Sequence, residues 1–283
     1  MNCIIGLELR WARGRSNDQA TPGKHERLNL AKGLIGIATF LAAWQFLSVT
    51  KMVDPVLLPP PTDIFKSSLE LLQSGELAKH AAISARRAAG GFVVGALPAI
   101  VIGLLTARLP RLAAYVDPLL QMFRSIPPLA LVPFGVFWFG IGETSKIALV
   151  AWSVFFPVWV NTEAGVREVS PLLVRAAFCL GAKRWQMFFF VHLPAALPYI
   201  ITGLKVSLSA AISTLVAAEL AGAVYGLGYL VQISQQVFRV DLMFVCLIAL
   251  GMGSLIVNRV FDICVKALAP WYGGEREAVS ESA

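Results

Sequence analysis

Residues 170–194, SPLLVRAAFCLGAKRWQMFFFVHLP, lie between two strongly apolar segments long enough to cross a bilayer. Ser170 and Pro171 are typical of a helix start, because serine can cap the first turn and proline lacks an N–H that has no partner there. Gly181 can leave a helix in a left-handed conformation without steric cost. Pro194 is expected to end or bend the second helix. The stretch therefore predicts a polar helical hairpin between two membrane spans.

The composition predicts an all-α membrane protein. Hydrophobic residues make up 57% of the 283 residues, charged residues make up 14%, and the mean hydropathy is +0.70. Soluble domains contain about 25% charged residues, so this chain has too little polar surface to stay dissolved. Six apolar segments are long enough to be transmembrane helices, at about residues 30–49, 88–107, 126–141, 145–161, 197–218 and 241–257.

The remaining segments divide the chain into three regions. Residues 1–28 are polar and basic and are expected to form a disordered cytoplasmic tail, residues 29–270 form the six-span domain, and residues 271–283 form a second cytoplasmic tail. Ser74-Gly75 is expected to interrupt a short helix, after which residues 76–87 either lie flat on the membrane or brace the bundle. A polar connector is expected before Ser125, and Pro133 is expected to kink the third span.

The distribution of basic residues predicts which side of the membrane each loop faces. Of the 24 Lys and Arg, 16 fall on the side of the amino terminus and 7 on the other side, while Lys205 lies within a span. Cytoplasmic loops carry the excess of Lys and Arg, so both termini and residues 170–194 are expected to be cytoplasmic. This placement also explains the net charge of +7 without any nucleic-acid partner.

The spacing inside residues 170–194 resembles a known family signature. Ala176-Ala177, three residues, Gly181, nine residues and then Val191-His192-Leu193-Pro194 resemble the EAA loop of ABC-importer permeases, Glu-Ala-Ala-x3-Gly-x9-Ile-x-Leu-Pro. In that family the loop forms coupling helices that dock on the ATP-hydrolysing subunit. The resemblance implies ATPase-coupling roles for Arg175, Ala176, Ala177, Gly181, Leu193 and Pro194. Arg175 replaces the family's glutamate, so a contact made by that carboxylate does not carry over.

The resemblance covers about residues 30–270. LLPPPTDIF at 57–65, RSIPPLALVPFGVFWFGIGE at 124–143 and ELAGAVYGLGYLV at 219–231 resemble permeases of the nitrate, sulfonate, taurine and bicarbonate group. It implies a type I importer fold, like that of the methionine permease, in the cell inner membrane. The implied assembly is a homodimer of this chain with membrane lipid around it, two copies of an ATP-binding subunit, and a periplasmic or lipid-anchored substrate-binding protein. Transport of a small solute, expected to be an anion, would proceed by alternating access.

The chain's own chemistry is sparse. No Gly-x4-Gly-Lys-Ser/Thr stretch occurs, so ATP hydrolysis is not expected in this chain, and it is predicted not to be an enzyme and to have no catalytic residue or cofactor. The three histidines, His25, His80 and His192, are far apart and near polar edges, and the four cysteines are scattered, so no metal site or disulfide is expected.

Two ionisable residues are candidates for the translocation path or gate. Lys205 lies within the fifth span, where it would either face an anion path or snorkel to the cytoplasmic interface. Glu219 ends the same helix near the outer face, where it would pair with a basic residue, shape an outer gate, or be a solvated helix end. A structural or gating role is preferred for Glu219, since an unpaired carboxylate would repel an anionic solute.

Two other classes of membrane protein are weighed against the importer. A stand-alone secondary transporter or channel predicts an internal repeat or paired charges within the membrane, and neither is evident in the sequence. A non-transporting scaffold explains the spans but not the spacing between Gly181 and Pro194. Association of the chain with an ATPase would distinguish the importer from both of these alternatives.

Overall fold

The computed structural model describes residues 22–50, 54 and 56–268, with side chains from residue 35 onward. The chain divides into two compact units, residues 1–63 and 64–283, and each is described by itself. Throughout the described residues the regular structure is helical, as the sequence predicts.

The first unit contains α2 (Pro22–Val49), which includes the first predicted span. Residues 22–28 belong to this helix and not to the predicted tail, while residues 1–21 of that tail lie outside the described residues. The connector after α2 folds back on it: Ser48 donates a hydrogen bond to the Leu58 carbonyl at 2.6 Å, and the Gln45 side chain bonds Thr62.

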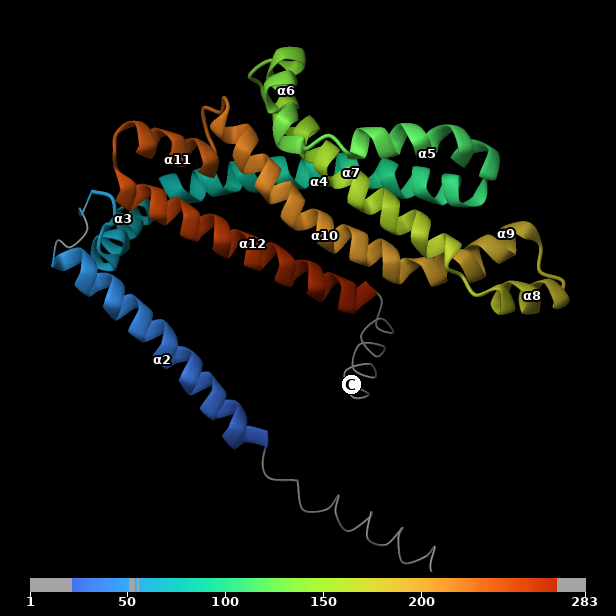
Figure 1. Cartoon of the computed structure of the whole chain (residues 1–283), viewed down its shortest axis with the longest axis horizontal. Helices are drawn as coiled ribbons and strands as arrows, with labels where there is room; N and C mark the ends of the chain where they lie inside the picture. The colour runs from blue at the N-terminus through green and yellow to red at the C-terminus, as the bar shows by residue number, and fades with distance from the viewer. Residues whose placement is uncertain (1–21, 51–53, 55, 269–283) are drawn as a thin grey trace, which may run out of the picture. The chain divides into compact units, whose positions relative to one another are not determined.

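The second unit is built around α7 (Glu143–Arg167), which packs along both α4 (Glu76–Arg108) and α10 (Leu193–Leu220), as Figure 1 shows. The other elements are α3 (Pro61–Gln73), which begins in the first unit, α5 (Pro110–Arg124), η1 (Pro128–Leu131), α6 (Val132–Phe139), α8 (Pro171–Cys179), α9 (Arg184–Met187), η2 (Phe188–His192), α11 (Leu227–Gln236) and α12 (Val240–Leu268).

Small residues on α4 allow α7 to approach closely. Trp159 and Val154 of α7 are fully buried among alanines of α4 and α10. A Cβ placed on Gly95 would lie 2.9 Å from the Ala151 Cα atom, closer than carbon atoms normally come. Lipid gives helices no hydrophobic reason to associate, so this close van der Waals contact is a main source of their association.

α4 differs from its prediction, because residues 76–87 and the second predicted span form one helix of 33 residues. The chain breaks only at Gly75, where φ is 74°, and Pro98 does not end the helix. At a rise of about 1.5 Å per residue, α4 is about 50 Å long, which exceeds the ~30 Å hydrocarbon core. Its first turns therefore carry polar side chains that belong to the same rigid element as the span.

The chain bends sharply at the start of the third predicted span. Residues 110–124, expected to be a polar connector, form α5, and α5 and the pair η1–α6 meet at an angle of 84°. The break falls at Pro127-Pro128, where neither proline can donate a backbone hydrogen bond and each restricts the residue before it. Pro133 lies in the first turn of α6, where it costs no hydrogen bond, so the predicted kink at this residue is wrong.

Among the described residues, four helical stretches are long and apolar enough to cross a membrane, namely Glu76–Arg108, Glu143–Arg167, Arg184–Leu220 and Val240–Ala267. The bent pair Pro110–Arg124 and Pro128–Phe139 counts as a fifth if it forms one span, and Ile35–Val49 is a shorter apolar helix. The predicted boundaries of six spans stay a prediction. α12 continues to Leu268, beyond the predicted polar boundary near Arg259, and residues 271–283 lie outside the described residues.

The α4–α7 contact can be tested with two alanine substitutions in one helix. We expect Gly95→Ala to lower the stability of the purified protein by about 1–3 kcal/mol, because the added methyl group meets the α7 backbone. Gly90→Ala adds the same methyl group where the nearest atom, Ile147 Cδ1, would be 3.8 Å away. Thermal unfolding in detergent measures both, and equal effects at the two positions would contradict the close packing.

Candidate functional site

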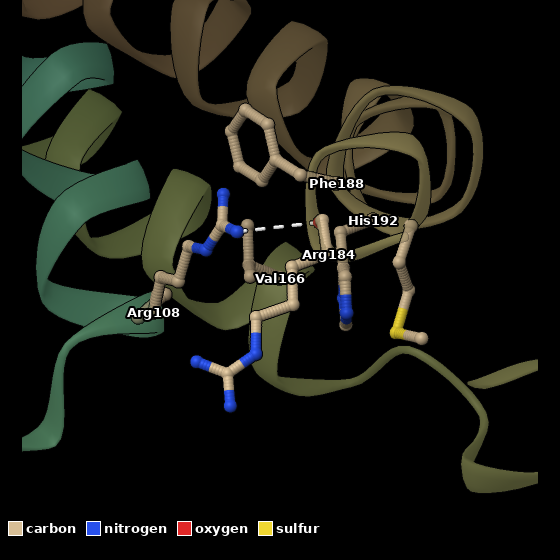
Figure 2. Close-up of a pocket in the computed structure, with 7 residues that line it drawn as sticks. Arg108, Val166, Arg184, Phe188 and His192 are labelled. Atoms are coloured by element: carbon tan, nitrogen blue, oxygen red, sulfur yellow. Dashed lines mark hydrogen bonds between the residues drawn. The ribbon is translucent and has the colours of Figure 1, made fainter. Parts of the chain in front are cut away.

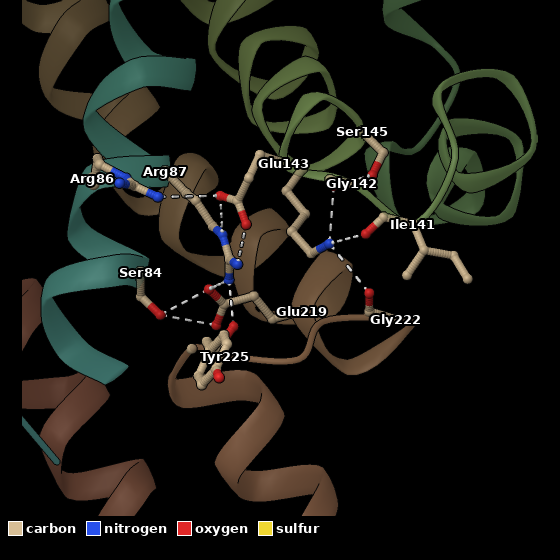
Figure 3. Close-up of polar contacts among 12 residues, drawn as sticks. Ser84, Arg86, Arg87, Ile141, Gly142, Glu143, Ser145, Glu219, Gly222 and Tyr225 are labelled. Carbon is tan, nitrogen blue, oxygen red and sulfur yellow. Dashed lines mark hydrogen bonds and ion pairs between the residues drawn. The ribbon is translucent and has the colours of Figure 1, made fainter. Parts of the chain in front are cut away.

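A buried ionic network lies at one end of the second unit (Figure 3). Arg87 of α4 donates to Glu143 at the start of α7, from Nε at 2.7 Å and from Nη2 at 2.5 Å, and to Glu219 of α10 from Nη1 at 2.8 Å. Only 3% of the Arg87 side chain is exposed. One guanidinium therefore joins the three principal helices of the bundle.

Glu219 is the most buried charged residue of this network, with no exposed side-chain surface. Besides Arg87, its carboxylate accepts hydrogen bonds from the Ser84 hydroxyl at 2.8 Å and from the Gly228 N–H at 2.9 Å. Taking a carboxylate out of water costs several kcal/mol unless it is paired and hydrogen-bonded. These donors supply that compensation, so the position of Glu219 depends on α4 and on the start of α11.

The same side chains hold the loop of residues 221–226 between α10 and α11. Arg87 also donates to the Tyr225 carbonyl at 2.5 Å, the Gly226 N–H donates to His80 Nδ1 at 2.9 Å, and the Leu227 N–H donates to the Ser84 hydroxyl at 2.9 Å. The φ angle of Gly226 is 129°, and a Cβ there would overlap the Glu219 carboxylate. Only glycine fits this position.

Lys146 of α7 extends the network to a second turn. Its ammonium group donates to the carbonyls of Ile141, Gly142 and Gly222 at 2.9, 3.0 and 3.2 Å, and 3% of the residue is exposed. The turn that leads into α7 is thereby fastened to the loop after α10 (Figure 3). Two loops far apart in the sequence form one polar structure.

The contacts of Glu219 test two of the three predictions made for it. The residue pairs with a basic side chain, and the prediction of a solvated helix end is wrong. Sequence reasoning missed its partners, although a signal was present: His80, Ser84 and Arg87 are spaced by four and three residues and therefore share one helix face. His80 is buried in this face and not at a polar edge as predicted. A gating role for Glu219 stays a prediction.

Lys205, the other candidate, forms an ion pair that neither prediction for it included. Its ammonium group lies 2.6 Å from the Asp262 carboxylate of α12, and the two side chains are 37% and 39% exposed. The sequence placed Asp262 in a polar tail, because α12 was expected to end near residue 257. The pair therefore became visible only when α10 and α12 were seen side by side.

Residues 170–194 fold as the predicted helix, break and helix. α8 ends at Cys179, and the chain turns at Gly181, where φ is 77°. The N–H groups of Gly181 and Ala182 donate to the Phe178 and Ala177 carbonyls. The Ser170 side chain forms no capping hydrogen bond, contrary to prediction; its carbonyl instead accepts from the first turn of α8. After the break, the Gln186 side chain accepts from the Lys183 N–H at 2.8 Å and starts α9.

The second half of this segment differs from its prediction. α9, the π-helical turn η2 and α10 follow one another as a continuous helical stretch, Arg184–Leu220. Pro194 does not end this stretch, because it directly follows the π-helical turn η2 as the second residue of α10. A bend at Pro194 stays a prediction. Leu193 is the first residue of α10. The segment is therefore joined without a break to the helix that carries Lys205 and Glu219.

α8 presents large apolar side chains to the outside. Leu172, Phe178 and Leu180 are 75%, 74% and 87% exposed, and Arg175 and Ala176 are exposed between them. Ala177 is partly covered and lies at the edge of a shallow hollow with Gly181 and Gln186. Several large exposed apolar side chains within so short a segment are typical of a contact with a partner.

The described residues were compared with the arrangement that a metal site requires. Within the part of the chain that the structure describes, no three His, Cys, Asp or Glu side chains are grouped closely enough to hold a metal ion. Cys179, Cys246 and Cys264 are free thiols.

Comparison with known proteins gives the family. Residues 99–273 match the family described as the inner membrane component of binding-protein-dependent transport systems. The chain belongs to this family. The match covers α5 to α12 in full, including the predicted coupling segment and the loops of the buried network.

Similar proteins agree with this assignment. The chain is 35% identical over 242 residues to the taurine transport system permease protein TauC of Escherichia coli, covering 84% of this chain and 88% of TauC. It is 38% identical to the putative aliphatic sulfonates transport permease protein SsuC of Bacillus subtilis, covering 88% and 90%. A solved chain of the inward-facing MetNI methionine ABC transporter shares the fold, with a TM-score of 0.53, 23% identity, and coverage of 71% of this chain and 98% of that chain.

The resemblance to ABC-importer permeases is thereby confirmed. The protein is a multi-pass inner-membrane permease subunit with the all-α type I fold, and it works with an ATP-binding subunit and a substrate-binding protein. It is a transport subunit and not an enzyme, since ATP hydrolysis belongs to the separate partner. The stand-alone transporter is not favoured.

The buried network can be tested at Arg87. We expect Arg87→Gln to destabilise the protein by about 3–5 kcal/mol, because the substitution leaves the fully buried Glu219 without its cation. Arg86→Gln is the matched control. The Arg86 side chain is next in sequence to Arg87 and lies 3.8 Å from Glu143, but it is 74% exposed. Thermal unfolding of both variants in detergent provides the measurement. A loss at Arg86 as large as that at Arg87 would show that charge alone, and not the buried geometry, matters.

Proposed function

We propose that this permease imports a small sulfonate anion, with two copies of the chain forming the path and two ATP-binding subunits driving it. The support for the solute class is the similarity to permeases named for taurine and aliphatic sulfonates. The support for two copies is the family's usual architecture together with the exposed apolar surface of α12 in the single chain.

The proposed orientation places both termini and residues 170–194 in the cytoplasm. It is supported by the excess of Lys and Arg on that side of the predicted spans. The buried network of Arg87, Glu143 and Glu219 then lies at the outer side, where the binding protein delivers the solute. The apolar face of α8 lies where an ATPase can reach it.

In the proposed mechanism, residues 170–194 couple ATP hydrolysis to the opening of the path. The side chains of Leu172, Phe178 and Leu180 insert into the ATPase, and the Gly181 turn fixes the angle between α8 and α9. Arg175, Ala176 and Ala177 form the α8 surface at this contact, and Leu193 and Pro194 join it to α10. Since Arg184–Leu220 is one continuous helical stretch, a shift of the docked segment moves the inner end of α10 directly. The network around Glu219 holds its outer end and forms the outer gate.

The Gly181 turn provides the test of coupling. Gly181→Val forces a left-handed conformation on a branched residue, which costs roughly 1–2 kcal/mol and distorts the hairpin. We expect co-purification of the ATPase with the chain to fall at least tenfold, while membrane insertion is retained.

Gly75→Val is the matched control for this substitution. Gly75 has a φ of 74°, against 77° for Gly181, and a Cβ at either position meets no atom within 4 Å. The two variants therefore carry the same local strain, but Gly75 lies between α3 and α4, away from the proposed coupling segment. Full ATPase capture and full transport by Gly181→Val would contradict the coupling role.

Lys205 is proposed as a path residue that recognises the anion. Its partner Asp262 neutralises it while the path is empty, so the pair avoids the cost of an isolated charge within the membrane. Both side chains are more than a third exposed in the single chain, which leaves the lysine accessible to a solute. A sulfonate group can then compete with the carboxylate for the ammonium group.

Uptake by the reconstituted complex tests the solute and the lysine together. We expect the wild-type chain, with its ATPase and binding protein, to drive ATP-dependent uptake of taurine or a simple alkanesulfonate. Lys205→Ala should lower the rate at least tenfold, because the charge-assisted contact is worth about 1.5–3 kcal/mol. Asp262→Asn should retain uptake, since it keeps the lysine. Unchanged uptake by Lys205→Ala at equal protein level would exclude the path role, and no uptake of any sulfonate by the wild-type complex would refute the solute class.

A further inference from the structure

A basic pocket lies beside the proposed coupling segment and is not used by the mechanism above. It has a volume of about 290 Å³ and is formed where the end of α4 meets the turn of α9 and η2. Arg108 of α4, and Arg184 and His192 of the turn, supply its polar side chains. Figure 2 shows Arg184 and His192 reaching from the turn toward the same side, with the Arg108 side chain between the turn and α4.

The Arg108 side chain is held in place, and neither arginine of the pocket is neutralised by a carboxylate within the described residues. Arg108 donates to the Arg184 carbonyl at 3.3 Å, and its guanidinium lies 4.7 Å from the centre of the Phe188 ring. Within the described residues, neither Arg108 nor Arg184 forms an ion pair with a carboxylate, whereas Arg87, Arg167 and Arg239 each do. Two uncompensated guanidinium groups at one pocket attract an anion.

The histidine adds a second, independent observation. In the part of the chain that the structure describes, His192 Nδ1 is a buried atom without a hydrogen-bond partner. Buried polar atoms are nearly always hydrogen-bonded, so an unpartnered one at a pocket calls for a ligand atom. An imidazole N–H beside two guanidinium groups is suited to the oxygens of a phosphate.

The other walls of the pocket favour a phospholipid over a free ion. Val166, Met187 and Phe188 give it an apolar side, which an inorganic phosphate would leave unused but which suits the glycerol and acyl carbons of a lipid. Basic pockets between transmembrane helices on the cytoplasmic side are typical binding sites for anionic headgroups. With residues 170–194 on the cytoplasmic side, the pocket lies at the level of the inner-leaflet phosphates.

We propose that Arg108, Arg184 and His192 bind the phosphate of an anionic phospholipid and so anchor the coupling segment to the inner leaflet. The lipid phosphate bridges the end of α4 to the turn between α9 and η2. The placement in the inner leaflet rests on the proposed function, but lipid binding itself can be measured without transport.

The experiment measures which lipid stays bound. The chain, in complex with its ATPase, is reconstituted in nanodiscs of equal phosphatidylglycerol and phosphatidylcholine, and native mass spectrometry counts the retained lipids. We expect the wild type to retain phosphatidylglycerol in preference to phosphatidylcholine. The double variant R108Q/R184Q should lose this preference by roughly fivefold for each arginine removed.

The matched control is R111Q/R124Q, which removes the same charge from exposed positions outside the pocket and outside residues 170–194. Retention of phosphatidylglycerol by the control and its loss in R108Q/R184Q supports the proposal. Equal loss in both double variants, or no preference in the wild type, would overturn it, since only general attraction to the surface would remain. If R108Q/R184Q does not give a monodisperse complex, the single variant R108Q is compared with R111Q, with a fivefold difference expected.

A second arm distinguishes the lipid from a free anion. The complex is held in phosphatidylcholine alone and titrated with millimolar inorganic phosphate while thermal unfolding is followed. No stabilisation of the wild type relative to R108Q/R184Q supports the lipid. Stabilisation by phosphate without any preference for phosphatidylglycerol overturns it in favour of a soluble ligand. Failure of the ATPase to co-purify would instead count against the proposed function, so the two failures are told apart.

Discussion

The constraint on which this fold depends is the burial of the Glu219 carboxylate at the end of a membrane helix. A fully buried charge is tolerated only when donors surround it, and here those donors come from α4 and from the start of α11. Arg87 also donates to Glu143, which ties the start of α7 to the same site. The glycines at 226 and 228 are part of the same constraint, because side chains there would occupy the space of the carboxylate. Loop conformation and helix packing at this end are therefore set by one charge.

Away from this network, the helices pack closely because small residues lie at their contacts. α4 approaches α7 through glycines, and the fully buried side chains of α7 are mostly valines together with Trp159. The two ends of the bundle thus differ in kind. One end is fixed by a buried ionic network, while the end near residues 170–194 has exposed apolar side chains and a more exposed ion pair between Arg167 and Asp117. Within the described residues, Arg108 and Arg184 at that end form no ion pair with a carboxylate. This difference between the two ends fits a permease whose one end binds the ATPase and whose other end gates the solute path.

Much of the class and little of the site could be predicted from the sequence. Low charge and long apolar segments predicted the all-helical membrane fold, and the spacing around Gly181 predicted both the hairpin and the family. The bend at Pro127-Pro128 was missed because a polar connector was predicted before residue 126, whereas residues 110–124 form the helix α5, which the two prolines end. The predicted end of α12 was too early, which concealed Asp262 as the partner of Lys205.

Ion pairs across helices depend on tertiary contacts that no local pattern specifies. Arg87 and Glu219 are separated by 132 residues, and the sequence around either residue does not indicate the other as its partner. The face shared by His80, Ser84 and Arg87 could have been recognised from its spacing, but its counterpart could not. By contrast, the left-handed turn at Gly181 is decided by the residue itself, and this explains why it was predicted correctly.

The π-helical turn η2 sets the rotational phase of α10. Each residue of an α-helix advances the side-chain direction by about 100°, so the number of residues between the docked segment and α10 fixes which way every later side chain faces. Deleting one residue from η2 would leave α10 helical but turn it about its own axis relative to α8. Glu219 would then face away from Arg87, and Lys205 away from Asp262. The number of residues in η2 therefore fixes how Lys205 and Glu219 are oriented relative to the proposed ATPase-docking surface of α8.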